Sequence, residues 1–262
     1  KLLDLFKMYI ASFWLMLKLK IKTIHSRGPV AAQTGAFLKL FFNSKLIFDC
    51  RGLWVDERVN KGGWDLKKPF DNLQYKIFKR IEKKTLSQSD AIIVLTEAVV
   101  DEILKLANIS KDIIRVIPCC ADYKLFSPVD KNTKTKLRAQ LGINDALVLG
   151  YLGSIGPMYK FDSYVRMIQI ANSINKNVLG LIVTHNVLVA EEKLNSILKK
   201  EEVKFFRIVS ASREEVPNYI NCFDVMINFL TRSYARIATS PTRNAESFAC
   251  GVPVICNSGI GD

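Results

Sequence analysis

One short segment of the sequence places a cation and a carboxylate at helical spacing. It reads SPTRNAESFACGVPVI over residues 240–255. Ser240 is a favourable N-cap and Pro241 a favourable first helical residue, so Arg243 falls in the first turn. Glu246 lies three residues on, on the same helix face. A helix start with an arginine favours a phosphate, and a carboxylate can accept hydrogen bonds from ribose hydroxyls. The segment predicts a nucleoside diphosphate site, with a solvated Arg–Glu pair as the alternative.

A glycine-containing turn is a second place where an anion could bind. A β-rich run ends at Leu152 and leads into Gly153, Ser154 and Gly156, and Lys160 stands where a helix should begin. Glycines let the backbone approach a ligand closely, and the lysine could neutralise phosphate. The spacing G-x-x-G-x-x-G differs from the dinucleotide fingerprint G-x-G-x-x-G. An ordinary strand-to-helix turn is the alternative.

Charged residues also follow two short strands in the first half of the sequence. IHSRGP contains His25 and Arg27, and IFDCRGLWVDER contains Asp49 and Arg51. We predict a charged rim made of these four residues together with Asp56 and Glu57, and we predict that the four take part in catalysis. A histidine satisfied by backbone and an Asp49–Arg51 pair that braces its loop are the structural alternatives. His185 follows a later strand and could line the donor site or serve structure.

These segments require a scaffold of alternating strands and helices. Apolar runs such as Ala91–Leu95 and Val178–Val183, separated by helical stretches, predict parallel sheets covered on both faces. Residues 118–135 are rich in Pro, Asp, Ser and Lys, which is typical of an interdomain connection. The sequence therefore predicts an α/β protein with two doubly wound Rossmann-like domains facing a cleft, residues 1–124 and 125–262. Ligands in such folds bind at the carboxyl ends of the strands.

Two finer predictions concern single elements. Residues 50–68, rich in Gly, Trp and charge, are predicted to form a long loop. Val203–Phe206 is predicted to be a strand, because it contains an apolar run between helical stretches.

Composition restricts the class of protein. The chain has 262 residues, 49% of them apolar and 24% charged, as expected for a globular protein. The net charge of +13, concentrated in the first half, attracts phosphates of nucleic acid, anionic lipid or a nucleotide. Six cysteines without a C-x-x-C pair and only two histidines argue against a zinc site and indicate thiols in a reducing cytoplasm. There is no D-x-D motif, so no metal and no other cofactor is expected.

The segment KLLDLFKMYIASFWLMLKLKIK, residues 1–22, combines apolar residues with lysines. Its longest apolar run, Met8–Leu17, is too short to span a bilayer. As a helix it could lie on an anionic membrane or pack against a sheet, and the sequence leaves both open.

With these motifs in order, the sequence resembles the glycosyltransferase family 4 group, whose fold is the two-domain GT-B type. SPTRNAESFACGVPVICNSGIGD resembles the donor-binding signature of that group, and it follows IPCCADYKLFSP and YLGSIG, which resemble the start of its donor domain. The resemblance implies that Glu246 binds the nucleotide ribose and that Lys160 binds phosphate. It assigns the donor site to Gly153, Ser154, Lys160, Ser240, Thr242, Arg243 and Glu246.

Three positions depart from the family pattern. Ala238 stands where the family has the first of two glutamates, and Ser154 stands where many members have arginine. Arg27 stands at the second histidine of the acceptor-domain His-x-His. We infer that Arg243 replaces the missing arginine.

The resemblance implies a retaining, metal-independent transfer of a sugar from a nucleotide-diphosphate donor to a glycan or lipid-linked glycan, such as a bacterial surface polysaccharide precursor. The protein would be cytoplasmic, peripheral on an anionic inner membrane face, with no nucleic-acid partner. Because the sequence starts at Lys1 and stops at Asp262, we expect a fragment whose N-terminal domain is incomplete and whose C-terminal domain is truncated.

Two other classes of protein remain as alternatives. A nucleotide-sugar epimerase or NAD-dependent oxidoreductase is disfavoured by the glycine spacing. A non-enzymatic, basic nucleic-acid-binding module is disfavoured because the basic residues are spread over several elements.

Overall fold

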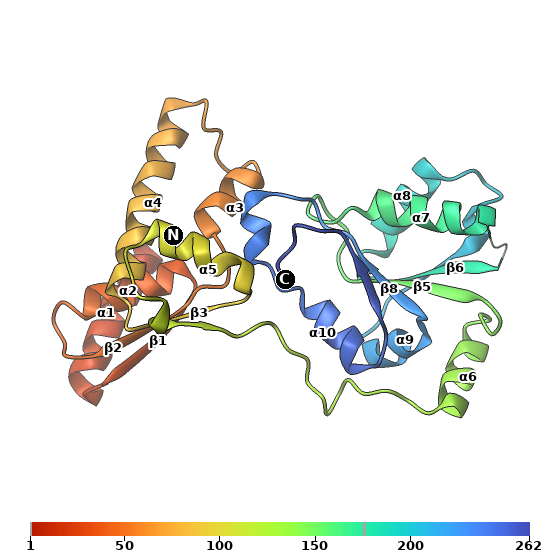
Figure 1. Ribbon diagram of the computed structural model, residues 1–262, viewed down its shortest axis with the longest axis horizontal. Coiled ribbons are helices and arrows are strands. Elements are labelled where there is room, and N and C mark those ends of the chain that lie inside the picture. Colours follow the sequence, from red (N-terminus) through yellow and green to blue (C-terminus); the bar gives the residue numbers. More distant parts are fainter. Residues whose placement is uncertain (1, 175–176) are drawn as a thin grey trace. The chain divides into compact units, whose positions relative to one another are not determined.

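The computed structural model describes residues 2–174 and 177–262 (Figure 1). The chain forms two compact units. Unit 1 contains the chain up to Pro118 together with Arg232–Ser240 and Gly259–Asp262, and unit 2 contains Cys119–Thr231 and Pro241–Ser258. Each unit has its own parallel sheet, as the α/β prediction requires. The predicted domain division at 124/125 stays a prediction. In the structure, two late segments of the chain belong to unit 1.

The elements of unit 1 are α1 (Leu2–Leu19), β1 (Thr23–Arg27), α2 (Pro29–Leu38), β2 (Lys45–Asp49), α3 (Trp54–Asn60), α4 (Pro69–Gln88), β3 (Ala91–Val94), α5 (Val100–Leu106), β4 (Ile114–Val116) and the 3₁₀ helices η1 (Glu97–Val99), η2 (Lys111–Ile113) and η4 (Tyr234–Ala238). Those of unit 2 are α6 (Lys131–Gln140), β5 (Leu147–Leu152), α7 (Phe161–Ile174), β6 (Val178–Val183), α8 (Val187–Ile197), η3 (Val203–Phe205), β7 (Phe206–Val209), α9 (Val216–Cys222), β8 (Val225–Asn228), α10 (Thr242–Ala249) and β9 (Val254–Cys256).

The sheet of unit 1 has the order β1-β2-β3-β4, with all strands parallel. Arg27 pairs in register with Asp49, so the carboxyl ends of β1 and β2 bring both residues to one edge of the sheet. Helix α2 packs closely on this sheet through Gly35. A Cβ at that position would lie 2.6 Å from Cδ1 of Leu46. The close approach of helix and sheet fixes where α2 begins, next to the ends of the two strands.

Two late segments complete unit 1. Ala235 and Ala238 of η4 are buried in its apolar core, and the Thr96 hydroxyl donates to the carbonyl oxygen of Ile237 at 2.6 Å. The Asp262 carboxylate accepts hydrogen bonds from the backbone N–H groups of Glu97 and Ala98, at 2.7 and 2.8 Å, at the start of η1. A negative charge is favourable at that end of a helix. Unit 1 is therefore not continuous in sequence.

The sheet of unit 2 has the order β7-β6-β5-β8-β9, so the strand order reverses at β5. Alternate residues of β5 face opposite sides. Val148 and Leu152 pack in the cluster that contains α9, whereas Leu149 and Tyr151 pack in the cluster that contains α7 and α8. Both faces of this sheet are therefore covered, as predicted for a doubly wound fold (Figure 1). In such sheets the crevice beside the reversal point is the usual ligand site.

Three local predictions are wrong. The predicted loop 50–68 contains helix α3, which packs against η4 of unit 1. The predicted strand at 203–206 is a 3₁₀ turn, and the strand begins at Phe206 instead. The predicted connection 118–135 ends early, because the Asp130 side chain accepts hydrogen bonds from the N–H groups of Asn132 and Thr133 and starts α6. A tertiary contact accompanies the first difference, and a side-chain cap explains the third.

Helix α1 packs on α2 along one face only. Tyr9 lies edge-on to Phe37, with ring centroids 5.2 Å apart, and Phe13 lies edge-on to Phe41 and Phe42. An apolar stripe on α1 stays exposed, comprising Leu3, Phe6, Ile10, Trp14 and Leu17. Within the described residues, no helix is long and apolar enough to cross a membrane.

Candidate functional site

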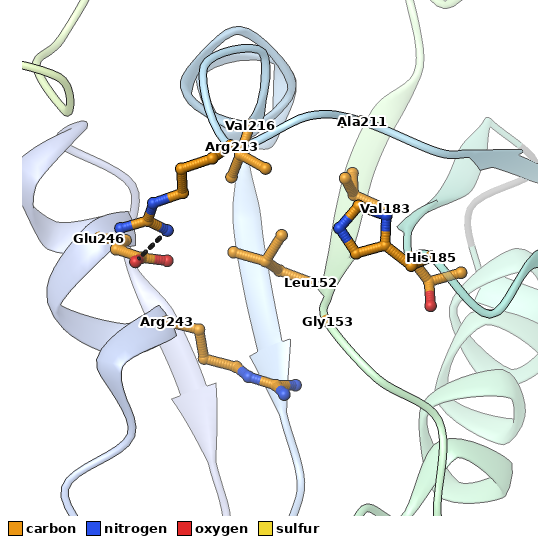
Figure 2. Close-up of a pocket in the computed structure, with 10 residues that line it drawn as sticks. Leu152, Gly153, Val183, His185, Ala211, Arg213, Val216, Arg243 and Glu246 are labelled. Carbon is orange, nitrogen blue, oxygen red and sulfur yellow. Dashed lines mark hydrogen bonds and ion pairs between the residues drawn. The ribbon is translucent and has the colours of Figure 1, made fainter.

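A pocket of about 260 Å³ lies at the carboxyl ends of β5, β6 and β7 in unit 2 (Figure 2). It is lined by residues that follow these strands and by one face of α10: Leu152, Gly153, Val183, Thr184, His185, Ala211, Arg213, Val216, Arg243 and Glu246. This is the position in an open α/β sheet at which ligands bind. The lining combines an apolar floor with two arginines, a histidine and a carboxylate.

Arg243 lies across the turn that follows β5. Its Cζ is 4.3 Å from the centroid of the Tyr159 ring and 5.8 Å from that of Tyr151. Gly153 has φ +108°, and a Cβ there would lie 2.6 Å from Nη2 of Arg243. The glycine therefore leaves room for the guanidinium. Among the described residues, the buried Nη1 of Arg243 finds no hydrogen-bond partner. A buried donor without a partner beside a pocket is suited to an anionic ligand.

Glu246 lies one turn deeper in α10 and is only 4% exposed. Its Oε1 accepts a hydrogen bond from Nη1 of Arg213 at 2.6 Å (Figure 2). The same guanidinium stacks on Phe126, with Cζ 4.5 Å from the ring centroid. The buried charge of Glu246 is thus balanced by an arginine from the segment between β7 and α9.

Two neutral side chains, those of Tyr151 and Cys250, lie near Arg243 and Glu246 respectively. Burial raises the pKa of Tyr151 to about 12 against the opposing effect of Arg243, so the phenol stays protonated and donates to the carbonyl oxygen of Ser154 at 2.8 Å. Burial, together with the Glu246 carboxylate, raises the pKa of Cys250 to about 11. Neither group is therefore a proton acceptor at neutral pH.

The structure brings together only some of the residues predicted for the donor site. Gly153, Arg243 and Glu246 line the pocket, whereas Lys160 and Ser154 are exposed outside its lining. The backbone N–H of Lys160 donates to the carbonyl oxygen of Phe229 at 3.0 Å, immediately before α7. Lys160 thus stands directly before a helix, as predicted, but its side chain does not line this pocket.

The predicted start of helix α10 is wrong by one residue. Thr242, which is exposed, is the first residue of α10, and Pro241 precedes the helix with φ −71° and ψ 119°. Pro241 therefore takes the N-cap position that was predicted for Ser240, and it makes no side-chain cap bond. Ser240 belongs to unit 1. The spacing of Arg243 and Glu246 on one helix face is unaffected.

Sequence reasoning missed Arg213 and underrated His185. Both follow strand ends, after β7 and β6 respectively, and both line the pocket. The rule that ligands bind at the carboxyl ends of parallel strands could have identified them. For Arg213 the misplaced strand 203–206 concealed this signal, because it put the strand end three residues too early.

A second pocket, of about 440 Å³, lies in unit 1 at the ends of β1 and β2. It is lined by Arg27, Gly28, Pro29, Phe48, Cys50, Arg51, Gly52, Trp54, Glu57 and Glu82. Two of the four residues predicted to be catalytic, Arg27 and Arg51, therefore share one pocket. Burial raises the pKa of Cys50 to about 12, so this thiol is protonated and unreactive at neutral pH.

The other two predicted catalytic residues are not in the lining of this pocket. His25 is exposed within β1, not in the loop that follows the strand. Asp49 ends β2 and is 8% exposed, and its Oδ2 lies 4.0 Å from Nη1 of Arg51. Within the described chain, Asp49 Oδ1 is buried without a hydrogen-bond partner. The predicted charged rim is therefore present in part.

The wall of the second pocket is held by a small charge network. Nζ of Lys79 lies 2.9 Å from Oδ2 of Asp56 and 2.7 Å from Oε2 of Glu82. Burial raises the pKa of Glu82, and Lys79 opposes that rise. Trp54 packs against Trp64, which is buried, so of the two tryptophans only Trp54 reaches the pocket.

Residues 2–174 and 177–262 contain no group of three or more His, Cys, Asp or Glu side chains that could hold a metal ion. The expectation of a metal-free reaction stays a prediction, because a metal can also be held by a substrate.

Comparison with known proteins gives the class. Residues 3–125 match the family described as Glycosyltransferase Family 4. TuaH of Bacillus subtilis (strain 168), a glycosyltransferase named for teichuronic acid biosynthesis, is 24% identical over 216 residues, which are 82% of this chain and 51% of TuaH. The present chain thus spans about half the length of that relative.

Solved structures share the fold over nearly the whole chain. HepE of Anabaena in complex with UDP superposes with a TM-score of 0.70 at 13% identity, covering 98% of this chain and 64% of HepE. Sucrose-phosphate synthase of Thermosynechococcus elongatus gives a TM-score of 0.67 at 22% identity, covering 98% of this chain and 61% of that protein. The two parallel-sheet units and these likenesses define a GT-B fold. The match over residues 3–125 and the glycosyltransferases among the similar proteins support the resemblance to glycosyltransferase family 4 seen in the motifs.

Proposed function

We propose that the whole protein transfers a sugar from a nucleotide-diphosphate donor to a growing glycan, and that unit 2 binds the donor. The observation that carries this proposal is that Arg243 and Glu246, on one face of α10, both line a pocket at the ends of strands. Structures of HepE with UDP and with UDP-glucose support uridine nucleotides as the first probes.

The donor would lie with its diphosphate at the start of α10 and its ribose deeper in the pocket. Arg243 has a buried donor without a protein partner in the described residues, and the helix start adds partial positive charge. Glu246 would accept hydrogen bonds from the two ribose hydroxyls. Lys160, exposed before α7, would reach the phosphates from outside the pocket lining.

The transfer step needs stabilisation of the leaving diphosphate. Arg243, Lys160 and the helix start would supply positive charge where negative charge develops. No side chain of the described residues stands out as a general base, so we propose that the diphosphate itself helps to remove the acceptor proton. The transfer would retain the anomeric configuration and need no metal. Activity that is unchanged by a chelator would support this, whereas activity restored only by a divalent cation would contradict it.

The acceptor would bind in unit 1, in the pocket between Arg27, Arg51 and Trp54. An indole ring suits the apolar face of a sugar, and the arginines suit its hydroxyl or acidic groups. His25 of β1 and Asp49, the last residue of β2, would act on the acceptor from outside the pocket lining. The likeness to TuaH supports a bacterial surface polysaccharide or its lipid-linked precursor as the acceptor.

Membrane attachment would occur through α1. Its exposed apolar stripe, from Leu3 to Leu17, is accompanied by Lys7 and Lys18, and Lys18 Nζ lies 4.7 Å from the Trp14 ring centroid. Such a helix can bind anionic lipid with its apolar face in the interface. We expect co-sedimentation with phosphatidylglycerol vesicles, reduced by Phe6→Glu but not by a glutamate at the exposed Tyr123. Equal binding of both variants would contradict this role of α1. If α1 does bind lipid in this way, we propose that the protein lies on the inner face of the cytoplasmic membrane.

Thermal unfolding with added nucleotides tests the donor proposal. UDP or GDP should raise the unfolding temperature, while NAD should not, because stabilisation follows binding to the folded state. Glu246→Ala should remove the shift and leave the fold intact. Stabilisation by NAD alone would favour an oxidoreductase, and salt-dependent stabilisation by RNA alone would favour a nucleic-acid-binding module.

A further inference from the structure

Glu246 is held by an arginine that comes from a separate element of unit 2. Arg213 lies between β7 and α9, and its Nη1 donates to Oε1 of Glu246 at 2.6 Å. On its other side the guanidinium stacks on Phe126, which is fully buried. A ring and a carboxylate therefore fix the guanidinium, although 52% of the Arg213 side chain is exposed.

We propose that Arg213 is a positioning residue for ribose recognition. By holding Oε1, it directs the second oxygen of Glu246 into the pocket, where the ribose hydroxyls would bind. Figure 2 shows Oε1 facing Arg213 and the other oxygen on the side of Leu152. This inference rests on the proposed function, because it requires a nucleotide in the pocket.

The physical reason is preorganisation of a buried acceptor. A glutamate has three rotatable side-chain bonds, and a ligand that had to order them would bind more weakly. Arginine holds a carboxylate in a defined plane through its fixed fork of N–H donors. Lysine would supply the charge but neither the fork nor the stacking on Phe126.

The affinities for UDP and for its 2′,3′-dideoxy analogue, measured by calorimetry on the 262-residue chain, separate positioning from a general structural effect. The wild-type chain should prefer UDP by at least about 100-fold, since two hydrogen bonds to a charged acceptor are lost with the analogue. Arg213→Gln should reduce this preference to about threefold or less, as Glu246→Gln does, with little change for the analogue. Arg213→Lys should give an intermediate ratio. Arg166→Gln, an exposed arginine of α7, is the matched control and should keep the wild-type ratio.

The outcomes separate this inference from the function on which it rests. If Arg213→Gln weakens UDP and the analogue equally, Arg213 acts on the phosphates or on the fold, and the positioning role is wrong. It is equally wrong if Glu246→Gln loses the preference while Arg213→Gln keeps it. If the wild-type chain binds neither nucleotide, the donor proposal itself fails.

Discussion

Replacing Gly153 by alanine would show how closely the turn after β5 is fitted to Arg243. The added Cβ would lie 2.6 Å from Nη2 and 3.0 Å from Cζ of that arginine, at a backbone φ of +108°. The backbone conformation costs about 1–3 kcal/mol for a residue with a side chain. Moving the guanidinium off the Tyr159 ring costs about 0.5–2 kcal/mol more. We expect the free energy of unfolding of unit 2 to fall by about 2–4 kcal/mol.

The same substitution should also weaken nucleotide binding. A displaced Arg243 would lose the charge-assisted hydrogen bond that we propose it makes to phosphate, which corresponds to at least about a tenfold weaker affinity for UDP. Urea unfolding and calorimetry measure the two effects separately.

Two other glycines provide matched controls. Gly142 has φ +65°, and a Cβ there would meet no described heavy atom within 4 Å, so Gly142→Ala isolates backbone strain of about 1–2 kcal/mol. Gly156→Ala has neither strain nor a contact and should be neutral. Gly142→Ala should not change UDP affinity. Wild-type UDP affinity in Gly153→Ala, or the same stability loss as in Gly142→Ala, would refute the fit between the turn and Arg243.

Three further predictions concern stability and reactivity. Gly150→Ala should destabilise unit 2 by about 3 kcal/mol or more in urea unfolding, because the new Cβ would lie 2.2 Å from the ring of Phe223, and a loss below about 1 kcal/mol would contradict this packing. Burial alone would raise the pKa of Asp224, but the backbone N–H of Val148 in β5 and the Arg138 guanidinium outweigh burial and lower this pKa below its ordinary value of 3.8. The ionised Asp224 therefore stabilises the fold above about pH 3.8, and this contribution is lost as the pH falls below that value. Asp224→Asn should therefore make the unfolding free energy less sensitive to acid than in the wild type, and an unchanged acid dependence would count against the pair. Cys50 should resist alkylation in the native protein at about pH 8, because burial raises its pKa to about 12, while the exposed cysteines react; labelling at equal rates would show that it is accessible.

The sequence was sufficient to predict the scaffold because apolar runs and helical periodicity report burial directly. Val178–Val183 is buried at every position and appears as a strand with the predicted bounds. The parallel pairing in both sheets also follows the pattern. Such strands are easy to recognise in a sequence because both of their faces are covered, so that nearly every residue is apolar.

Elements decided by distant contacts could not be predicted. Helix α3 is short and charged, and it contacts η4, which lies far along the chain. The placement of η4 in unit 1 depends on the burial of Ala235 and Ala238 against a core that no local pattern reveals.

The candidate site divides in the same way. The spacing of Arg243 and Glu246 is a local helical property, so the sequence was enough to place both on one face. The Arg213–Glu246 pair joins residues that are 33 positions apart in the sequence. The guanidinium of Arg243 in α10 lies against Gly153 in the turn after β5, so this contact also joins different elements. Both depend on tertiary packing, which spacing alone does not encode.

A structure of the chain with UDP bound tests the central claim most directly. We predict the diphosphate at the first turn of α10, within hydrogen-bond distance of Arg243, and the ribose hydroxyls on the free oxygen of Glu246. Nucleotide bound elsewhere on unit 2, or in this pocket with its ribose turned away from Glu246, would contradict the assignment.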